Sequence, residues 1–308
     1  MINKFLGFKR HEKVLINDGI INELLNSEIL QLDNYDNFSS EVWKRVFRKF
    51  NAIDKSKDLY NEEIVRSLYE NYFINGLSEG ACVGADMSRF KTKLKYKYRG
   101  YKRYKKLVNF CKYLNINDFN KYLKLNQSYN IGSPWLEMCE SNWINPEVLD
   151  HLYFFLTIKE SLSKFENICF IGDGSGILSN IILSELTFKK VVFIDMPHFL
   201  ARQFIVNYNS KKITTYFNPD NIDTELYQEK FVIINQDSFP EIPVQYLQKY
   251  FSFIKQNNKS EIYSYNKKDL SDGHCDFQNV LKDNGFYYNY SFESSMRSNY
   301  YIQRYYLS

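Results

Sequence analysis

The stretch Ile168-Cys169-Phe170-Ile171-Gly172-Asp173-Gly174-Ser175-Gly176 places four apolar residues directly before three glycines at every second position. A continuous apolar run of this kind is typical of a strand buried on both faces of a parallel sheet. The glycines permit a tight turn and leave the backbone open to a ligand. Beyond them, apolar residues recur at the spacing of a helix that packs one face on a sheet (Ile177, Leu178, Ile181, Ile182 and Leu186). Strand, glycine turn and helix together predict a nucleotide or cofactor pocket.

The spacing of the glycines narrows the choice of ligand. A dinucleotide fingerprint needs G-x-G-x-x-G, and neither Gly172 nor Gly174 starts such a pattern. A P-loop ends in Gly-Lys-Ser or Gly-Lys-Thr, and this turn contains no lysine. The next apolar run, Val191–Ile194, ends at Asp195, 19 residues beyond Gly176, where an acid can accept both ribose hydroxyls. The turn and the acid together favour a cofactor site over a turn that serves packing alone.

Composition sets the broad class of the protein. With 44% hydrophobic and 25% charged residues, the 308-residue chain has ordinary values for a globular protein, and a net charge of +4 is too small to demand a polyanionic partner. The five cysteines are scattered and form no C-x-x-C pair, which argues against a disulfide framework or a zinc site and favours a reducing cytoplasm. We find no signal-peptide pattern and no apolar run of about 18–20 residues, so we expect a soluble cytoplasmic protein.

The first 130 residues show helical periodicity. Apolar residues recur at steps of four over Val42–Phe50 and again from Tyr60 to Tyr72, and a third amphipathic pattern spans Tyr104–Leu114. No convincing alternating strand pattern and no catalytic motif precedes residue 130. We therefore expect a helical domain over residues 1–130, acting as a lid or an oligomerisation surface, and a catalytic domain over residues 131–308.

A basic run at residues 89–106 holds ten Lys or Arg residues with interleaved tyrosines. In a lysine-rich protein its simplest interpretation is a solvated face. The same residues could track nucleic-acid phosphates, hold the diphosphate of an activated or lipid-linked substrate, or lie against an anionic membrane. Among these binding hypotheses the diphosphate is favoured, but the run identifies no partner.

From Phe165 onward, strand and helix patterns alternate, which predicts a doubly wound, mostly parallel α/β sheet. Further strands are expected at Ile213–Phe217, Phe231–Ile234 and Glu261–Asn266, and two aromatic strands, Phe286–Phe292 and Asn299–Leu307, close the chain. Polar residues gather after the fourth strand, at the edge where open α/β sheets bind ligands.

Five segments carry a family resemblance, at Ile131–Pro134, Ile171–Gly176, Ile194–Pro197, Asp237–Glu241 and Arg304. Together they resemble class I S-adenosylmethionine-dependent methyltransferases, and more narrowly the sugar O-methyltransferases found with bacterial surface-polysaccharide genes. The resemblance covers roughly residues 131–308 and implies a Rossmann-like sheet with an antiparallel last strand.

The resemblance also implies the cofactor, S-adenosylmethionine, which leaves as S-adenosylhomocysteine. We expect it to be bound by the glycine turn, the ribose acid with its neighbour, and polar residues that follow the strands (Gly172, Asp173, Gly174, Gly176, Asp195, Met196, Asn218, Asn235 and Gln236). One position departs from the family pattern: two residues before the first glycine the family has an acid, and here Phe170 stands. Asp173 is the nearest candidate to replace that acid.

Methyl transfer to a sugar hydroxyl requires in-line alignment and a general base. Asp237 is the first candidate, and His274, whose ordinary pKa suits a base near neutrality, is the second. Glu241 could assist either residue. Asp237 and Glu241 could also hold a divalent ion, although no ligand spacing demands one.

Three functional hypotheses follow. The first is an O-methyltransferase acting on a nucleotide sugar or a surface-glycan precursor. The second is an RNA or other nucleic-acid methyltransferase that uses residues 89–106; the Asn-Pro-Pro-Tyr type of tetrad used on base amino groups is absent after the fourth strand, which counts against it. The third is a non-catalytic partner protein that kept the fold, suggested by Phe170. Homo-oligomerisation is open in all three.

Overall fold

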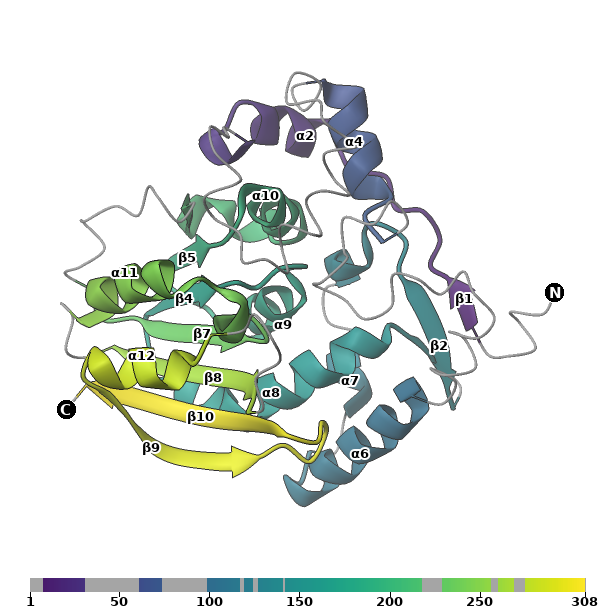
Figure 1. Cartoon of the computed structure of the whole chain (residues 1–308). Helices are drawn as coiled ribbons and strands as arrows, with labels where there is room; N and C mark the ends of the chain where they lie inside the picture. Colours follow the sequence, from purple (N-terminus) through teal and green to yellow (C-terminus); the bar gives the residue numbers. More distant parts are fainter. Residues whose placement is uncertain are drawn as a thin grey trace.

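The computed structural model describes residues 8–30, 61–73, 99–116, 119–123, 127–140, 142–217, 229–255, 260–268 and 275–307 (Figure 1). Its α-helices are α2 (Asp18–Leu25), α4 (Glu62–Glu70), α6 (Arg99–Tyr113), α7 (Phe119–Leu123), α8 (Pro146–Leu162), α9 (Ile177–Glu185), α10 (Pro197–Val206), α11 (Val244–Lys255) and α12 (Phe277–Asp283). Short 3-10 helices are η1 (Glu28–Leu30), η4 (Gln127–Asn130), η5 (Tyr208–Ile213) and η7 (Phe239–Glu241).

The strands form two sheets. A small antiparallel sheet contains β1 (Phe8–Arg10), β2 (Trp135–Cys139) and β3 (Asn142–Ile144). The large sheet contains β4 (Asn167–Ile171), β5 (Lys190–Ile194), β6 (Thr214–Phe217), β7 (Val232–Gln236), β8 (Glu261–Lys267), β9 (Phe286–Glu293) and β10 (Tyr300–Leu307).

The large sheet has the order β6-β5-β4-β7-β8-β10-β9. The first five strands of this order pair in parallel, and β10 is inserted antiparallel between β8 and β9. This confirms the predicted Rossmann-like α/β fold, mostly parallel with an antiparallel last strand. The chain builds outward from β4 through β5 to β6, then returns to β7 on the other side of β4, so the sheet has a switch point between β4 and β7.

Alternate residues of the central strands face two apolar layers, because successive side chains of a strand point to opposite faces. Phe170 and Phe193 face the core shared with α8, α9 and α10. Cys169 and Ile171 face the second core, which is formed with α11 and α12. The sheet is therefore buried between two helical layers, as the continuous apolar run predicted.

The described part of the first 130 residues joins the same core. Helix α2 packs against α4 and α10, and α6 packs against α8 (Figure 1). The expectation of no strand before residue 130 is wrong, because β1 pairs with β2 and links Phe8–Arg10 to Trp135–Cys139 across that position. A three-residue strand is too short to show periodicity. The predicted helix Val42–Phe50 lies outside the described residues, and the boundary at residue 130 stays a prediction.

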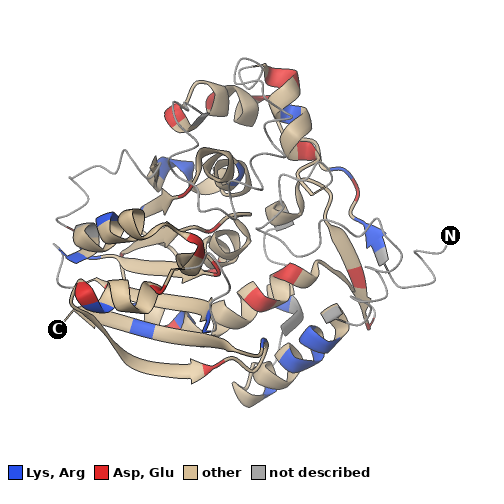
Figure 2. Ribbon diagram, in the orientation of Figure 1, with Lys and Arg blue, Asp and Glu red and all other residues tan. Residues whose placement is uncertain are grey.

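Charge is unevenly distributed over the helices. Figure 2 shows basic residues recurring along α6 and acidic residues near the start of α8. Among the residues that the structure describes, no helix has both the length and the apolar character needed to cross a bilayer.

Candidate functional site

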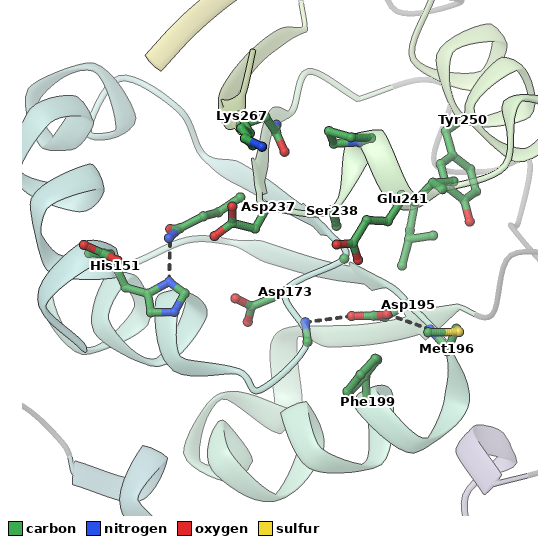
Figure 3. A pocket seen from close by; sticks show the side chains of 18 of the residues that line it. His151, Asp173, Asp195, Met196, Phe199, Asp237, Ser238, Glu241, Tyr250 and Lys267 are labelled. Atoms are coloured by element: carbon green, nitrogen blue, oxygen red, sulfur yellow. Dashed lines mark hydrogen bonds between the residues drawn. The ribbon is translucent and has the colours of Figure 1, made fainter. Parts of the chain in front are cut away.

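A cavity of about 290 Å³ opens at the carboxyl ends of the central strands, at the switch point of the sheet. Its walls come from α8, the β4–α9 turn, the starts of α10 and α11, the segment after β7, the end of β8, and the β9–β10 turn. Figure 3 shows side chains from several of these elements converging on it. Doubly wound sheets place their ligands at this position.

The glycine turn forms the floor of the cavity. Gly172, Gly174 and Gly176 have φ angles of +68°, +55° and +75°, a region that other residues enter only with strain. Gly172 also has no room for a side chain, since an added Cβ would lie 2.1 Å from Oγ of Ser238. The turn therefore needs glycine for torsion and for close approach to the end of β7. Gly172 and Gly174 line the cavity, whereas Gly176 is buried and starts α9.

The predicted ribose acid, Asp195, lies at the tip of β5. Its carboxylate accepts hydrogen bonds from the N–H of Gly174 at 2.9 Å, from the N–H of Met196 at 2.8 Å and from Nε2 of Gln203 at 2.6 Å. Burial raises the pKa of Asp195 to about 6, and these three donors oppose that rise. Gln203 was not predicted from the sequence; it lies about two helical turns beyond the acid and is buried in α10. A carboxylate has about four acceptor sites, so capacity for a ligand hydroxyl remains.

Asp173 lines the cavity and has an incompletely satisfied carboxylate. One oxygen accepts a long hydrogen bond, 3.4 Å, from the N–H of Ser179 at the start of α9. The other, Oδ1, is buried and has no hydrogen-bond partner among the described residues. Burial, with the negative charge of Asp195 adding to it, raises the pKa of Asp173 to about 8. An orphaned buried carboxylate oxygen is suited to a cationic ligand group.

Phe170 occupies the position where the family pattern has an acid, and it belongs entirely to the core. It is 1% exposed and stacks on Phe193 with the ring centroids 5.1 Å apart. Phe193 stacks in turn on Tyr216 at 5.3 Å, so one ring from each of β4, β5 and β6 forms a continuous column. The side chain at this position is therefore part of the core and does not line the cavity.

Asn235 and Gln236 end β7 and have different roles. Asn235 is buried, donates to the carbonyl of Ile171 at 2.8 Å and accepts from Asn266 at 2.8 Å, so it ties together the ends of β4, β7 and β8. It does not line the cavity, which makes it a support for the floor rather than the ligand contact that we expected. Gln236 does line the cavity, and its Oε1 lies 3.0 Å from Nδ1 of His151.

Asp237, the first candidate base, is at the cavity wall with φ +63°. It forms an ion pair with Arg297, which comes from the β9–β10 turn and covers the ring of Tyr300 at 3.5 Å. Arg297 also lies 3.9 Å from the buried carboxylate of Asp150, which pairs with Arg103 of α6 at 2.9 Å. The predicted base is thus one member of a charged network that joins β7, α6, α8 and the C-terminal hairpin.

The remaining predicted residues fall into two groups. Glu241 and Met196 line the cavity. Figure 3 shows Glu241 near Asp195, across the cavity from His151. His274 and Asn218 lie outside the described residues.

Helix α8 supplies cavity residues that the sequence analysis did not select. Asp150 and His151 follow Glu147 by three and four residues, so the three side chains share one face of the helix. All three line the cavity. Apolar residues flank His151 in the sequence, which by itself favours a structural role. The available signal was its spacing from the two acids, which places a histidine on an acidic stripe of an otherwise apolar helix.

Acidic residues outnumber basic ones around the cavity. The six Asp and Glu residues are Glu147, Asp150, Asp173, Asp195, Asp237 and Glu241, whereas the two basic residues are Lys267 and Arg297. Three of the six acids (Glu147, Asp150 and Asp237) pair with an arginine. The excess of carboxylates favours a ligand with positive charge over one with a diphosphate. Across the described ranges, no three His, Cys, Asp or Glu side chains are grouped as metal ligands would be.

Part of the basic run at residues 89–106 lies in α6. Arg103 is buried against Asp150, Lys105 pairs with Glu140 at 2.7 Å, and Nζ of Lys106 donates to the carbonyl of Met296. These three basic residues therefore hold α6 against the rest of the chain. The run from Arg89 to Tyr98 lies outside the described residues.

No family model matches this sequence, and no curated protein matches it. Three similar solved structures are methyltransferases by name. The first is the mitomycin 7-O-methyltransferase MmcR, with a TM-score of 0.40 and 12% identity over 53% of this chain and 55% of that chain. The second is the magnesium protoporphyrin IX methyltransferase ChlM from Synechocystis PCC 6803 with bound SAH, with a TM-score of 0.35 and 16% identity over 53% of this chain and 82% of that chain. The third is the methyltransferase domain of bacterial CtHen1-C, with a TM-score of 0.40 and 11% identity over 53% of this chain and 98% of that chain. At these identities and scores the likeness carries no argument about activity, so the assignment of the fold rests on the strand order of the chain itself.

Proposed function

We propose that this chain is an S-adenosylmethionine-dependent O-methyltransferase that acts on a hydroxyl of a sugar, either a nucleotide sugar or a glycan precursor. One observation carries the proposal. The cavity at the switch point of a sheet with an antiparallel inserted strand joins a glycine turn to a ribose-type acid, Asp195, at the tip of the neighbouring strand.

The charges of the cavity fit this cofactor better than a dinucleotide. S-adenosylmethionine has a sulfonium and an ammonium group, and both benefit from the surrounding carboxylates. The diphosphate of NAD would meet six acidic residues and only two basic ones. The turn also lacks the third glycine of a dinucleotide fingerprint.

The residues present divide naturally around the cofactor. Asp195 would hold the ribose, Met196 and Phe199 would contact the adenine, and the backbone from Gly172 to Gly174 would support the methionine part. Asp173, with its orphaned Oδ1, would receive the ammonium group in place of an acid at Phe170. The bound cofactor supplies a methyl group already activated for displacement.

The acceptor would enter beside Asp237, where polar and aromatic side chains share the wall. Tyr300 supplies an aromatic ring on this side of the cavity, and Lys267 with Asp237 offers hydrogen-bonding groups for hydroxyls. Arg103, Lys105 and Lys106 are engaged within the protein, so the acceptor screen compares nucleotide sugars with sugars that have no diphosphate.

Calorimetric titration with S-adenosylmethionine tests the proposal. We expect micromolar-range binding that is lost in Asp195→Ala, retained in the surface control Asp283→Ala and absent for NAD. A methyl-transfer screen with nucleotide sugars follows for the protein that binds. Folded protein without affinity for S-adenosylmethionine would contradict the enzyme proposal and support a non-catalytic partner. Binding to RNA that weakens steeply with salt would instead support nucleic-acid methylation.

A further inference from the structure

We propose that His151 is the general base of methyl transfer and that Gln236 fixes its tautomer; this inference rests on the proposed function above. The motifs around the glycine turn do not include this residue, because it belongs to α8, before the first strand of the large sheet.

The hydrogen bond between His151 and Gln236 determines which ring nitrogen is free. Nδ1 of His151 lies 3.0 Å from Oε1 of Gln236. An amide oxygen only accepts, so Nδ1 donates and carries the hydrogen of the neutral ring. Nε2 then has a lone pair, and it forms no hydrogen bond with any residue that the structure describes. Orientation of a catalytic imidazole by a second residue is the arrangement that general bases require.

The position of the ring suits the transferred methyl group. Figure 3 shows His151 at the opposite end of the cavity from Asp195 and Met196, with Asp173 between them. If Asp195 holds the ribose and Asp173 the ammonium group, the end of the cavity beside His151 and Asp237 is left for the acceptor. A hydroxyl bound there would meet Nε2 of His151.

The electrostatics of the pocket keep the ring available as a base. Burial lowers the pKa of His151, so the imidazole is neutral at pH 7. The charged groups that face it are Glu147 of the same helix and Asp237 after β7, which oppose that change, and Arg297 of the β9–β10 turn, which adds to it. Asp237 is less available for proton transfer because its carboxylate is held by Arg297.

The chemical step balances with His151 as the only proton acceptor. The hydroxyl oxygen of the acceptor forms a C–O bond to the methyl carbon as the sulfur–carbon bond breaks, and that bond's electron pair remains on sulfur. The hydroxyl proton passes to Nε2 of His151, and the resulting imidazolium returns the proton to solvent. No oxidant, reductant or metal is required.

The kinetic test compares wild type with His151→Asn and with a histidine control outside the cavity, His11→Asn. We expect each variant to bind S-adenosylhomocysteine within about threefold of wild type, because His151 is remote from Asp195. With acceptors found among UDP-, GDP- and dTDP-sugars, His151→Asn should lower turnover about 10²–10⁴-fold and abolish the acidic limb of the pH–rate profile. Unchanged turnover in that variant would overturn the inference.

A second measurement needs no acceptor. In ¹⁵N-histidine NMR spectra of the protein with S-adenosylhomocysteine, His151 should be neutral at pH 7.5 with the hydrogen on Nδ1. In Gln236→Leu, a mixture of tautomers should appear. A hydrogen on Nε2, or an imidazolium at pH 7.5, would refute the assignment of the base. Failure of the wild type to bind S-adenosylhomocysteine is a different result, since it would refute the proposed function itself.

Discussion

Replacing Asp173 with asparagine tests whether Asp173 binds the ammonium group of the ligand in place of the acid that the family pattern has at position 170. The substitution preserves shape and removes one charge. At a pKa of about 8, roughly one molecule in ten has Asp173 ionised at pH 7. A ligand ammonium binds the ionised form, so binding must first release a proton, which costs about 1.4 kcal/mol at pH 7 and little above pH 8.

The expected magnitude follows from that cost. A hydrogen bond between charged groups contributes about 1.5–3 kcal/mol, which corresponds to about 10–100-fold in Kd. At pH 8.5 we therefore expect Asp173→Asn to weaken S-adenosylhomocysteine binding about 10–100-fold. At pH 7 the ratio of the two Kd values should be about tenfold smaller, because binding to the wild type then includes the free-energy cost of ionising Asp173. The sign is fixed: wild-type affinity rises from pH 6 towards pH 8, whereas the variant lacks this rise.

Isothermal titration calorimetry measures both the Kd and the number of protons released on binding. Titrations at pH 7 in buffers of different ionisation enthalpy should show that the wild type releases about 0.9 proton more per complex than Asp173→Asn, in which only Asp195 contributes. The control ligand is 5′-methylthioadenosine, which has the nucleoside but no ammonium group. Its affinity should be the same in both proteins. Equal S-adenosylhomocysteine affinities at pH 8.5, or an equal loss for both ligands, would refute the reasoning.

Two further substitutions probe the floor and the sheet. Gly172→Ala should destabilise the protein by about 2–4 kcal/mol through torsional strain and the clash with Ser238, and thermal melts should show partial recovery when Ser238→Gly is added; a variant as stable as wild type would contradict the packing argument. Phe170→Asp introduces the acid of the family pattern. It should lower the free energy of unfolding by about 3–5 kcal/mol, because a carboxylate would be buried beside Phe193 without a partner. A stable variant that binds S-adenosylhomocysteine more tightly would show that the aromatic column is dispensable.

The sheet and its glycine turn were predictable because their signals are local. The apolar run of β4, the glycines and the acid after β5 lie within 28 consecutive residues, Ile168–Asp195, and each has a direct physical meaning. β1 was not predictable, since it has three residues and pairs with β2, more than a hundred residues away.

The site was predictable only in part, because a strand end shows which residues are polar but not which way each one points. Asn235 and Gln236 are adjacent and similar, yet the first ties strands together and the second meets His151. Arg297 reaches Asp237 only because β10 inserts antiparallel beside β8 and brings its turn back to the cavity. Such contacts depend on the assembled fold, and no short motif encodes them.

The hydrogen bond from the N–H of Gly174 to the carboxylate of Asp195 fixes the position of the glycine turn relative to the ribose acid. Asp173, the residue directly before Gly174 in the turn, is therefore coupled to whatever occupies Asp195. A nucleoside that donates to the remaining acceptor capacity of Asp195 binds the same carboxylate that restrains the turn, so we expect it to shift the position of the ammonium site. If adenosine and methionine were added as separate fragments, binding of one would then change the affinity for the other, with a coupling free energy transmitted through two residues of backbone. The cofactor's two ends would be recognised cooperatively rather than as independent halves.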